Sequence, residues 1–257
     1  MSRCIGKVAD GHGVILVDEA PPIRSLRFDS GARQSAIDLR FPWRPYLASA
    51  RRLVSGLLIH PAPRRILLLG LGGGTLARFF LMNRHCTVDV VENRQAVVAV
   101  AHRYFGLPAG RRLRIFVRDA REHIFGEPFN RASYDLIIAD VFGAHGIAPV
   151  AADPDFYHRL HQGLVPGGVL TANFWIRQLQ ADNSGGSVLK TAFGDSFRSV
   201  MTRTGNLVVI HSGVRGWPTK PLLVARAKKL EPAYDFDFDF LVRELSAAPA
   251  GIPPALA

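Results

Sequence analysis

Short uninterrupted runs of apolar residues recur through the middle of the chain, and longer segments of mixed apolar and polar residues separate them. Such runs are typical of strands that are buried on both faces of a sheet. The predicted strands are 66–69, 88–91, 113–117, 136–139 and 169–174, and the predicted helices between them are 75–83, 96–105 and 155–164. The alternation predicts an open, mostly parallel α/β sheet with right-handed crossovers.

The pattern divides the chain into three parts. Short strands at 14–17, 23–28 and 32–37 predict a small β-strand unit over 1–41, followed by a helix at about 46–59. The α/β domain extends over 42–230, with closing strands expected at 207–211 and 222–226. Residues 231–257 are expected to form a C-terminal tail, frayed in its Ala- and Pro-rich end from Ser246 onward.

A glycine-rich turn follows the first strand of the α/β domain, in the run from Gly70 to Gly74. Glycines allow a tight turn and a close approach of the backbone to a ligand, and the next helix offers unpaired N–H groups. Glu92 ends the second strand, where a carboxylate suits a ribose diol. A strand-to-helix turn without a ligand is the alternative interpretation of the glycines.

Other carboxylates occupy equivalent positions. Asp119 and Asp140 end later strands of the same predicted sheet, as Glu92 does. Carboxyl ends of parallel strands meet at one rim, which is where open α/β sheets bind ligands. The sequence therefore predicts a site for a nucleotide-like cofactor at this rim.

Composition and charge limit the other classes of function. The chain has 257 residues, is 48% hydrophobic and carries a formal net charge of +11, largely from arginine. Arginines at 111, 112, 114, 118 and 121 permit an acidic substrate or nucleic acid as partner. No aromatic-interleaved basic strip accompanies them, and this favours the simpler interpretation of surface cations.

Metal, redox and membrane functions find no support in the sequence. Cys4 and Cys86 lack metal or redox spacing, and His158 with His161 has no neighbouring ligand pattern, so we expect no metal. Neither a membrane-spanning run nor a signal peptide is visible. We therefore expect a cytoplasmic protein with no membrane partner.

Several segments together resemble the spermidine synthase family, in the same order along the chain. They are His60-Pro61-Ala62-Pro63-Arg64-Arg65-Ile66-Leu67, the glycine turn, Val91-Glu92, Val117-Arg118-Asp119-Ala120, Tyr134-Asp135-Leu136-Ile137-Ile138-Ala139-Asp140, and Phe156-Tyr157 with Leu164-Val165-Pro166-Gly167-Gly168. The resemblance covers roughly residues 14 to 228. It implies a Rossmann-like, class I S-adenosylmethionine-dependent methyltransferase-like fold preceded by a small β unit. It also implies transfer of an aminopropyl group from decarboxylated S-adenosylmethionine to an amine.

The resemblance implies roles for individual residues. The cofactor-binding residues would be Gly70, Gly72, Gly74, Glu92, Asp119, Ala120 and, from the end of the β unit, Gln34. Glu92 would bind the ribose hydroxyls, and Asp119 with Ala120 would meet the adenine. Asp140 would be the catalytic aspartate that accepts the amine proton, and the alternative for Asp140 is a carboxylate that only orients a ligand or caps a helix. The family commonly forms homo-oligomers through its β domain.

The chain departs from the family where the family binds charge. Gly72 stands where an acidic residue usually faces the cofactor's amino group, and Asp140-Val141-Phe142-Gly143 lacks a second aspartate for the polyamine. A positively charged protein also fits a polycationic acceptor poorly. Three hypotheses follow: an aminopropyltransferase-like enzyme with an altered polyamine site, a methyltransferase that uses intact S-adenosylmethionine, and a non-catalytic nucleoside-binding protein. We expect the loop 141–150 to be a lid that orders on ligand binding, with His145 or Phe142 then facing the substrate pocket. The alternative for His145 is a position on the surface.

Overall fold

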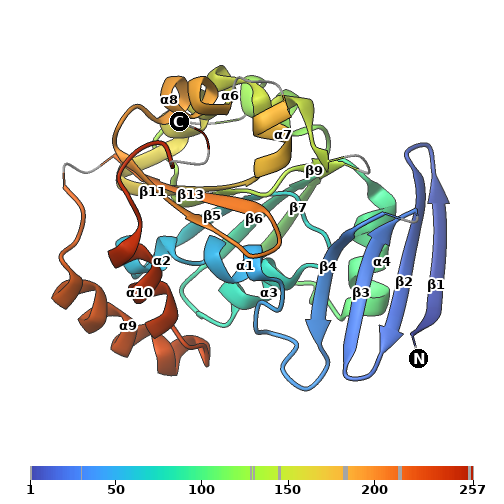
Figure 1. Ribbon diagram of the computed structural model, residues 1–257. Helices are drawn as coiled ribbons and strands as arrows, with labels where there is room; N and C mark the ends of the chain where they lie inside the picture. The colour runs from blue at the N-terminus through green and yellow to red at the C-terminus, as the bar shows by residue number, and fades with distance from the viewer. Residues whose placement is uncertain are drawn as a thin grey trace.

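The computed structural model describes residues 2–29, 31–127, 129, 131–143, 146–181, 185–213, 216–253 and 256. A seven-stranded sheet has the order β12-β13-β11-β8-β5-β6-β7 (Figure 1). The parallel strands are β5 (Arg65–Leu69), β6 (Thr87–Glu92), β7 (Leu113–Val117), β8 (Tyr134–Ala139) and β11 (Leu164–Trp175). β13 (Asn206–Ser212) runs antiparallel to β11 and to β12 (Phe197–Met201). The predicted mostly parallel sheet is confirmed.

Helices cover both faces of this sheet (Figure 1). On one face lie α5 (Ala120–Phe125), α6 (Pro154–Gly163), α7 (Ile176–Ala181) and α8 (Gly185–Phe193). On the other lie α1 (Ala48–Leu53), α2 (Gly56–Ile59), α3 (Thr75–Leu81), α4 (Gln95–Phe105), α9 (Lys220–Tyr234) and α10 (Asp239–Ala247). Along β5, Ile66 and Leu68 belong to one apolar cluster, and Leu67 and Leu69 belong to the other. Burial on both faces explains why the strands appear as continuous apolar runs.

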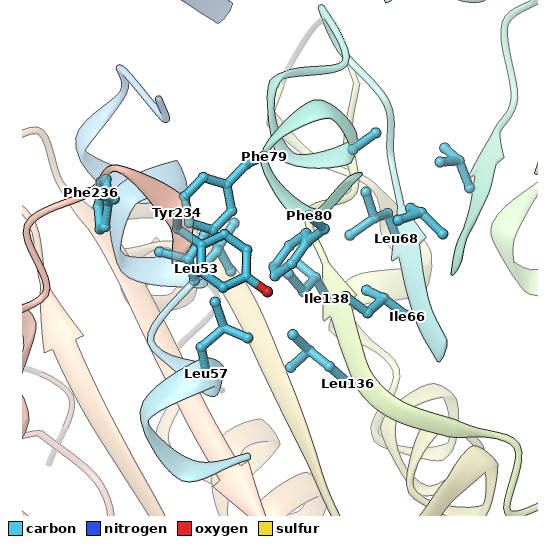
Figure 2. Close-up of a cluster of buried hydrophobic side chains, with 14 of the residues drawn as sticks. Leu53, Leu57, Ile66, Leu68, Phe79, Phe80, Leu136, Ile138, Tyr234 and Phe236 are labelled. Atoms are coloured by element: carbon cyan, nitrogen blue, oxygen red, sulfur yellow. The ribbon is translucent and has the colours of Figure 1, made fainter. Parts of the chain in front are cut away.

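The C-terminal part of the chain requires a correction. The strand expected at 222–226 is wrong because these residues lie inside α9, and α10 occupies much of the expected tail. Tyr234 lies against Phe79 of α3 (Figure 2). The two rings are stacked, with centroids 4.7 Å apart. Leu241 and Leu245 of α10 are buried in the same cluster. The buried residues of α9 follow helical spacing, but the short apolar run 222–225 at its beginning resembles a strand.

The N-terminal unit is a four-stranded antiparallel sheet, so the predicted β unit is also confirmed. It consists of β1 (Arg3–Asp10), β2 (Gly13–Ala20), β3 (Ile23–Phe28) and β4 (Arg33–Asp38). β1 was missed by the sequence analysis. Arg94, which precedes α4, donates hydrogen bonds of 2.7 and 3.0 Å to Asp10. This ion pair links the small sheet to the α/β domain.

Other local elements differ from the expectation. The helix expected at 46–59 is two short helices, α1 and α2. α5 was not predicted, and the segment after β8 contains the two-residue strands β9 (Phe142–Gly143) and β10 (Gly146–Ile147) and the 3-10 helix η1 (Pro149–Ala152). Within the described ranges, no helix is both long and apolar enough to span a membrane.

His161 and His211 form a partly buried pair between α6 and β13, with ring centroids 4.1 Å apart. Burial, and for His161 also the neighbouring histidines, lowers the pKa of His161 to about 3 and that of His211 to about 4. The folded state therefore keeps both rings neutral at pH values where the unfolded chain binds protons.

We expect the free energy of unfolding to fall as the pH drops below about 6.5, because the unfolded state then binds more protons than the folded state. The loss between pH 7 and pH 5 should be roughly 2 kcal/mol for each histidine, or about 4 kcal/mol for the pair, measured by urea unfolding. His211→Phe should flatten this dependence, whereas His12→Gln on the surface should not. Equal slopes in wild type and His211→Phe would contradict the assignment.

Candidate active site

A cavity of about 440 Å³ opens at the carboxyl ends of the parallel strands. β5, β6, β7 and β8 contribute the residues at their ends, and β4, the beginning of α1, the end of β11 and the start of β13 contribute other parts of the wall. The predicted site residues on this wall are Gln34, Gly70, Gly72, Glu92, Asp119, Ala120 and Asp140. The structure thus brings together residues from distant parts of the chain. Gly74 lies outside this lining, at the N-cap of α3.

Backbone hydrogen bonds connect the strand ends around the cavity. The Gly70 N–H donates to the Val91 carbonyl at 2.8 Å, and the Asp140 N–H donates to the Leu69 carbonyl at 2.9 Å. The Arg118 N–H donates to the Glu92 carbonyl at 3.1 Å. The sheet ladder therefore continues to the rim, so the candidate side chains project from a rigid base.

The glycine turn requires glycine for two physical reasons. Gly70, Gly72 and Gly74 have φ values of 94°, 53° and 74°, a region that L side chains rarely adopt. A Cβ on Gly70 would also lie 2.3 Å from the carbonyl oxygen of Asp140. The backbone of the β5 turn therefore packs directly against the backbone that carries Asp140.

Glu92 is buried at the end of β6, with 8% of its surface exposed. The Leu71 N–H donates to one of its carboxylate oxygens at 3.0 Å, and the Arg94 N–H donates to the other at 2.9 Å. Burial raises the pKa of Glu92, while these two backbone donors act against that rise. Two backbone donors orient the carboxylate at the cavity wall, where it can accept hydrogen bonds from a diol.

Asp119 has a structural task as well as a place on the cavity wall. Its Oδ1 accepts hydrogen bonds from the N–H groups of Arg121 at 2.7 Å and Glu122 at 3.2 Å, which caps α5. Ala120 begins that helix. The cap holds both residues at the cavity, next to the end of β6.

Asp140 follows β8 and is partly exposed to the cavity. The side chain of Asn173 on β11 donates a hydrogen bond of 2.9 Å from Nδ2 to Asp140 Oδ1. Desolvation raises the pKa of Asp140, and the bond from Asn173 opposes the rise. Asp140 does not cap a following α-helix, because the next described elements are β9 and β10.

The segment after Asp140 forms part of the wall through Val141, Phe142, Ala148 and Val150. The ring of Phe142 packs against Trp175 with centroids 6.0 Å apart. Phe142 therefore lines the cavity, which is one of the two placements expected for this loop. His145 lies outside the described residues, and ordering of the loop on ligand binding stays a prediction.

Sequence reasoning missed several residues on the wall. They are Arg33 of β4, Asn173 and Trp175 of β11, and Thr204 and Asn206 at the start of β13. The polar Asn173 inside the apolar run 169–174 was the available signal, since a buried amide needs partners. The others come from β4, the end of β11 and the start of β13, and only the tertiary structure brings these segments together around the cavity.

The arginines around β7 have intramolecular partners that account for much of the local charge. Arg114 pairs with Asp89, Arg121 pairs with Asp153, and Arg112 donates to the carbonyl oxygens of Leu81, Asn83 and Cys86. A role in binding nucleic acid stays untested.

The candidate metal ligands lie in a different part of the chain. Among the described residues, the carboxylates close enough together to share a cation are Glu231, Asp237 and Asp239, and none of them lines this cavity. His161 pairs with His211, while His158 Nε2 lies 2.8 Å from the Thr191 carbonyl oxygen. These contacts place the two histidines in the packing between α6, α8 and β13.

We expect Gly70→Ala to lower the free energy of unfolding by roughly 2 kcal/mol or more, because its Cβ meets the Asp140 carbonyl and its φ is positive. Gly110→Ala is the matched control, since nothing lies within 4 Å of a Cβ there. Urea unfolding of both variants measures the difference. Equal stability of the two would show that the turn relaxes without cost.

Comparisons with known proteins agree with this geometry. No protein-family model matches the chain. It is 29% identical over 235 residues to a polyamine aminopropyltransferase of Chromobacterium violaceum, covering 89% of this chain and 88% of the relative. It is 28% identical to the Vibrio vulnificus protein of the same name, over 85% of this chain and 75% of that one.

Solved structures show the same fold. A probable spermidine synthase from Corynebacterium glutamicum gives a TM-score of 0.71 at 22% identity, with 97% of both chains covered. A spermidine synthase in complex with the transition-state analogue AdoDATO gives 0.65 at 16% identity, over 95% of this chain and 88% of that one. Human methyltransferase-like protein 13 in complex with SAH gives 0.63 at 22% identity, over 81% and 96%. The fold is therefore the class I methyltransferase-like fold, and over most of its length the chain is similar to proteins named polyamine aminopropyltransferase.

Proposed function

We propose that this protein is an aminopropyltransferase-like enzyme, which moves an aminopropyl group from decarboxylated S-adenosylmethionine to an amine acceptor. The observation that carries the proposal is the position of Asp140, which shares one cavity with the glycine turn and Glu92. Relatives named polyamine aminopropyltransferase over most of the chain support it.

The nucleoside part of the co-substrate fits the end of the cavity formed by β5, β6 and β7. Glu92 accepts the ribose hydroxyls, with its carboxylate held by the backbone of Leu71 and Arg94. The turn at Gly70 and Gly72 supplies a surface without side chains, which allows close approach of the ligand. Asp119 and Ala120 lie beside the end of β6, where the adenine would extend.

The transfer is a single displacement at carbon. The amine nitrogen forms a bond to the aminopropyl methylene that is attached to sulfur. The bond between that carbon and sulfur breaks, and its electron pair stays on sulfur. The sulfonium becomes the neutral thioether of 5′-methylthioadenosine, so the leaving group needs no acid. The amine loses a proton, which Asp140 accepts. Alignment of the two substrates in a cavity that excludes water supplies much of the remaining rate.

The acceptor end of the cavity favours an amine of low charge. Glu92 ends β6 and Asp119 follows β7, both on the nucleoside side. This leaves Asp140 as the carboxylate beside the acceptor among the described lining residues. Neither segment 141–150 nor segment 43–59 contains Asp or Glu. Phe142, Val150 and Trp175 supply an apolar wall. One ammonium group and an apolar tail match these surroundings better than a triamine does.

A methyltransferase that uses intact S-adenosylmethionine is the second candidate. Its support is Gly72, since an uncharged turn does not repel the carboxylate of the intact cofactor, and Arg33 and Arg118 lie on the same cavity wall. The fold likeness to a methyltransferase in complex with SAH is consistent with this candidate.

Homo-oligomer formation through the N-terminal sheet remains a further expectation.

Calorimetric titration with decarboxylated and intact S-adenosylmethionine, at equal salt and pH, separates the two candidates. We expect the decarboxylated form to bind at least about tenfold tighter, a difference of about 1.4 kcal/mol. Asp119→Asn and Glu92→Gln should weaken binding of both forms, which shows that the same pocket is titrated. Equal or tighter binding of the intact form would favour methyl transfer over aminopropyl transfer.

Turnover with decarboxylated S-adenosylmethionine and a series of mono-, di- and triamines tests the reaction itself. We expect product with the wild type, faster for a monoamine than for a triamine, and its loss in Asp140→Asn because the proton acceptor is removed. Cofactor affinity of Asp140→Asn should stay within about tenfold of wild type. Formation of 5′-methylthioadenosine and of the alkylated amine is the measurement.

Two results would count against this proposal. Unchanged turnover in Asp140→Asn would remove that residue from the role of base. Tight co-substrate binding without product for any amine would favour the non-catalytic nucleoside-binding protein.

A further inference from the structure

A chain of polar side chains extends from Asp140 across β11 to the beginning of β13. Asn173 Nδ2 donates to Asp140 Oδ1 at 2.9 Å, and Asn206 Nδ2 donates to Asn173 Oδ1 at 3.1 Å. Thr204 Oγ1 donates to Asn206 Oδ1 at 3.2 Å. We propose that Asn173 and Asn206 are positioning residues, which hold Asp140 in one orientation and favour its anionic form through a hydrogen-bond chain of fixed direction. The proposal rests on the proposed function only for the catalytic use of Asp140.

The direction of the chain follows from the chemistry of its first member. An ionised carboxylate only accepts hydrogen bonds, so Asn173 must turn its amide nitrogen toward Asp140. Its amide oxygen then faces Asn206, which must present its own nitrogen. The oxygen of Asn206 is left to accept from the hydroxyl of Thr204. Every donor therefore points toward Asp140, and each bond polarises the next in the same sense.

The surroundings keep this chain in place. Asn173 is 4% exposed, on a strand that pairs with β8 on one side and β13 on the other. The Asn206 N–H donates to Thr202 Oγ1 at 3.0 Å, and the Thr202 N–H donates to the Asn206 carbonyl at 2.7 Å. The Ile176 N–H donates to the Gly205 carbonyl at 3.0 Å, which fastens the turn to the end of β11. Asn206 thus has little freedom to turn away from Asn173.

The charges near Asp140 explain why a hydrogen-bond chain would influence the ionisation of its carboxyl group. Charged side chains on the cavity wall are Arg33 on β4, Glu92 on β6, and Arg118 and Asp119 after β7. The β5 turn, the segment 47–50 and the end of β11 contribute uncharged residues. Burial favours the neutral acid, and in these surroundings the donated hydrogen bond of Asn173 is the opposing influence on the carboxyl. An anionic Asp140 can bind an ammonium group and then accept its proton, whereas a neutral one can do neither.

Substitution of Asn206 tests the chain without touching Asp140 or its direct donor. In Asn206→Asp, residue 206 can only accept, so the amide of Asn173 must rotate and present its oxygen to Asp140. In Asn206→Leu, a side chain of similar size removes the donor without adding charge. The titration of Asp140 is followed by NMR of ¹³C-carboxyl-labelled aspartate, with the Asp140 signal identified by its absence in Asp140→Asn.

We expect the titration midpoint of Asp140 to rise by at least about one pH unit in Asn206→Asp and to rise, by less, in Asn206→Leu. The acid limb of the kcat profile should move upward with it, and turnover should recover at high pH. A rise in the charged variant alone would be a simple effect of the added carboxylate and would overturn the proposal. Unchanged midpoints in both variants would overturn it as well.

The NMR titration needs no turnover, so its result stands if the aminopropyltransferase assignment fails. A change in KM with an unchanged carboxyl titration would place Asn206 in direct contact with the acceptor instead, and would also overturn the positioning role. Thermal unfolding of both variants confirms that they are folded under the conditions of the titration.

Discussion

The site depends on the close approach of two backbone segments, the turn after β5 and the residue after β8. The Asp140 N–H bonds to the Leu69 carbonyl, and Gly70 lies so near the Asp140 carbonyl that a Cβ would have no room. This contact sets the distance between the surface that would receive a nucleoside and the carboxylate that would meet an amine. A turn with a side chain at Gly70 would separate the two halves of the cavity.

The carboxylates around the cavity are oriented by different kinds of hydrogen-bond donor. Glu92 is oriented by backbone N–H groups, Asp119 by the helix that it caps, and Asp140 by the amide of Asn173. Backbone donors belong to rigid elements and leave little freedom. A side-chain donor such as Asn173 needs its own support, which comes from β13 through Asn206. The antiparallel strands at the edge of the sheet therefore contribute to the chemistry as well as to the core.

Several of the arginines that give the chain its positive net charge act outside the cavity, whereas Arg33 and Arg118 lie on its wall. Arg114 and Arg121 pair with aspartates outside the cavity, and Arg112 donates to backbone carbonyl groups. The acceptor end is shaped by apolar side chains such as Trp175 and Phe142 around one carboxylate. Local fields of this kind depend on groups within a few ångströms, since water and salt screen the more distant surface charges.

The sequence by itself determined the parallel core and the residues at its carboxyl ends. Continuous apolar runs indicate strands that are buried on both faces, and residues just after such runs lie at the rim of the sheet. The positions of Gly70, Glu92, Asp119 and Asp140 at the rim therefore follow from the sequence alone. Only the tertiary structure decided that α9 is a helix where a strand was expected, that α10 forms within the expected tail and packs against α9, and that Asn173 and Asn206 reach Asp140. Local patterns report which face of an element is buried, whereas partners that are far apart in sequence are selected by packing, which no local pattern records.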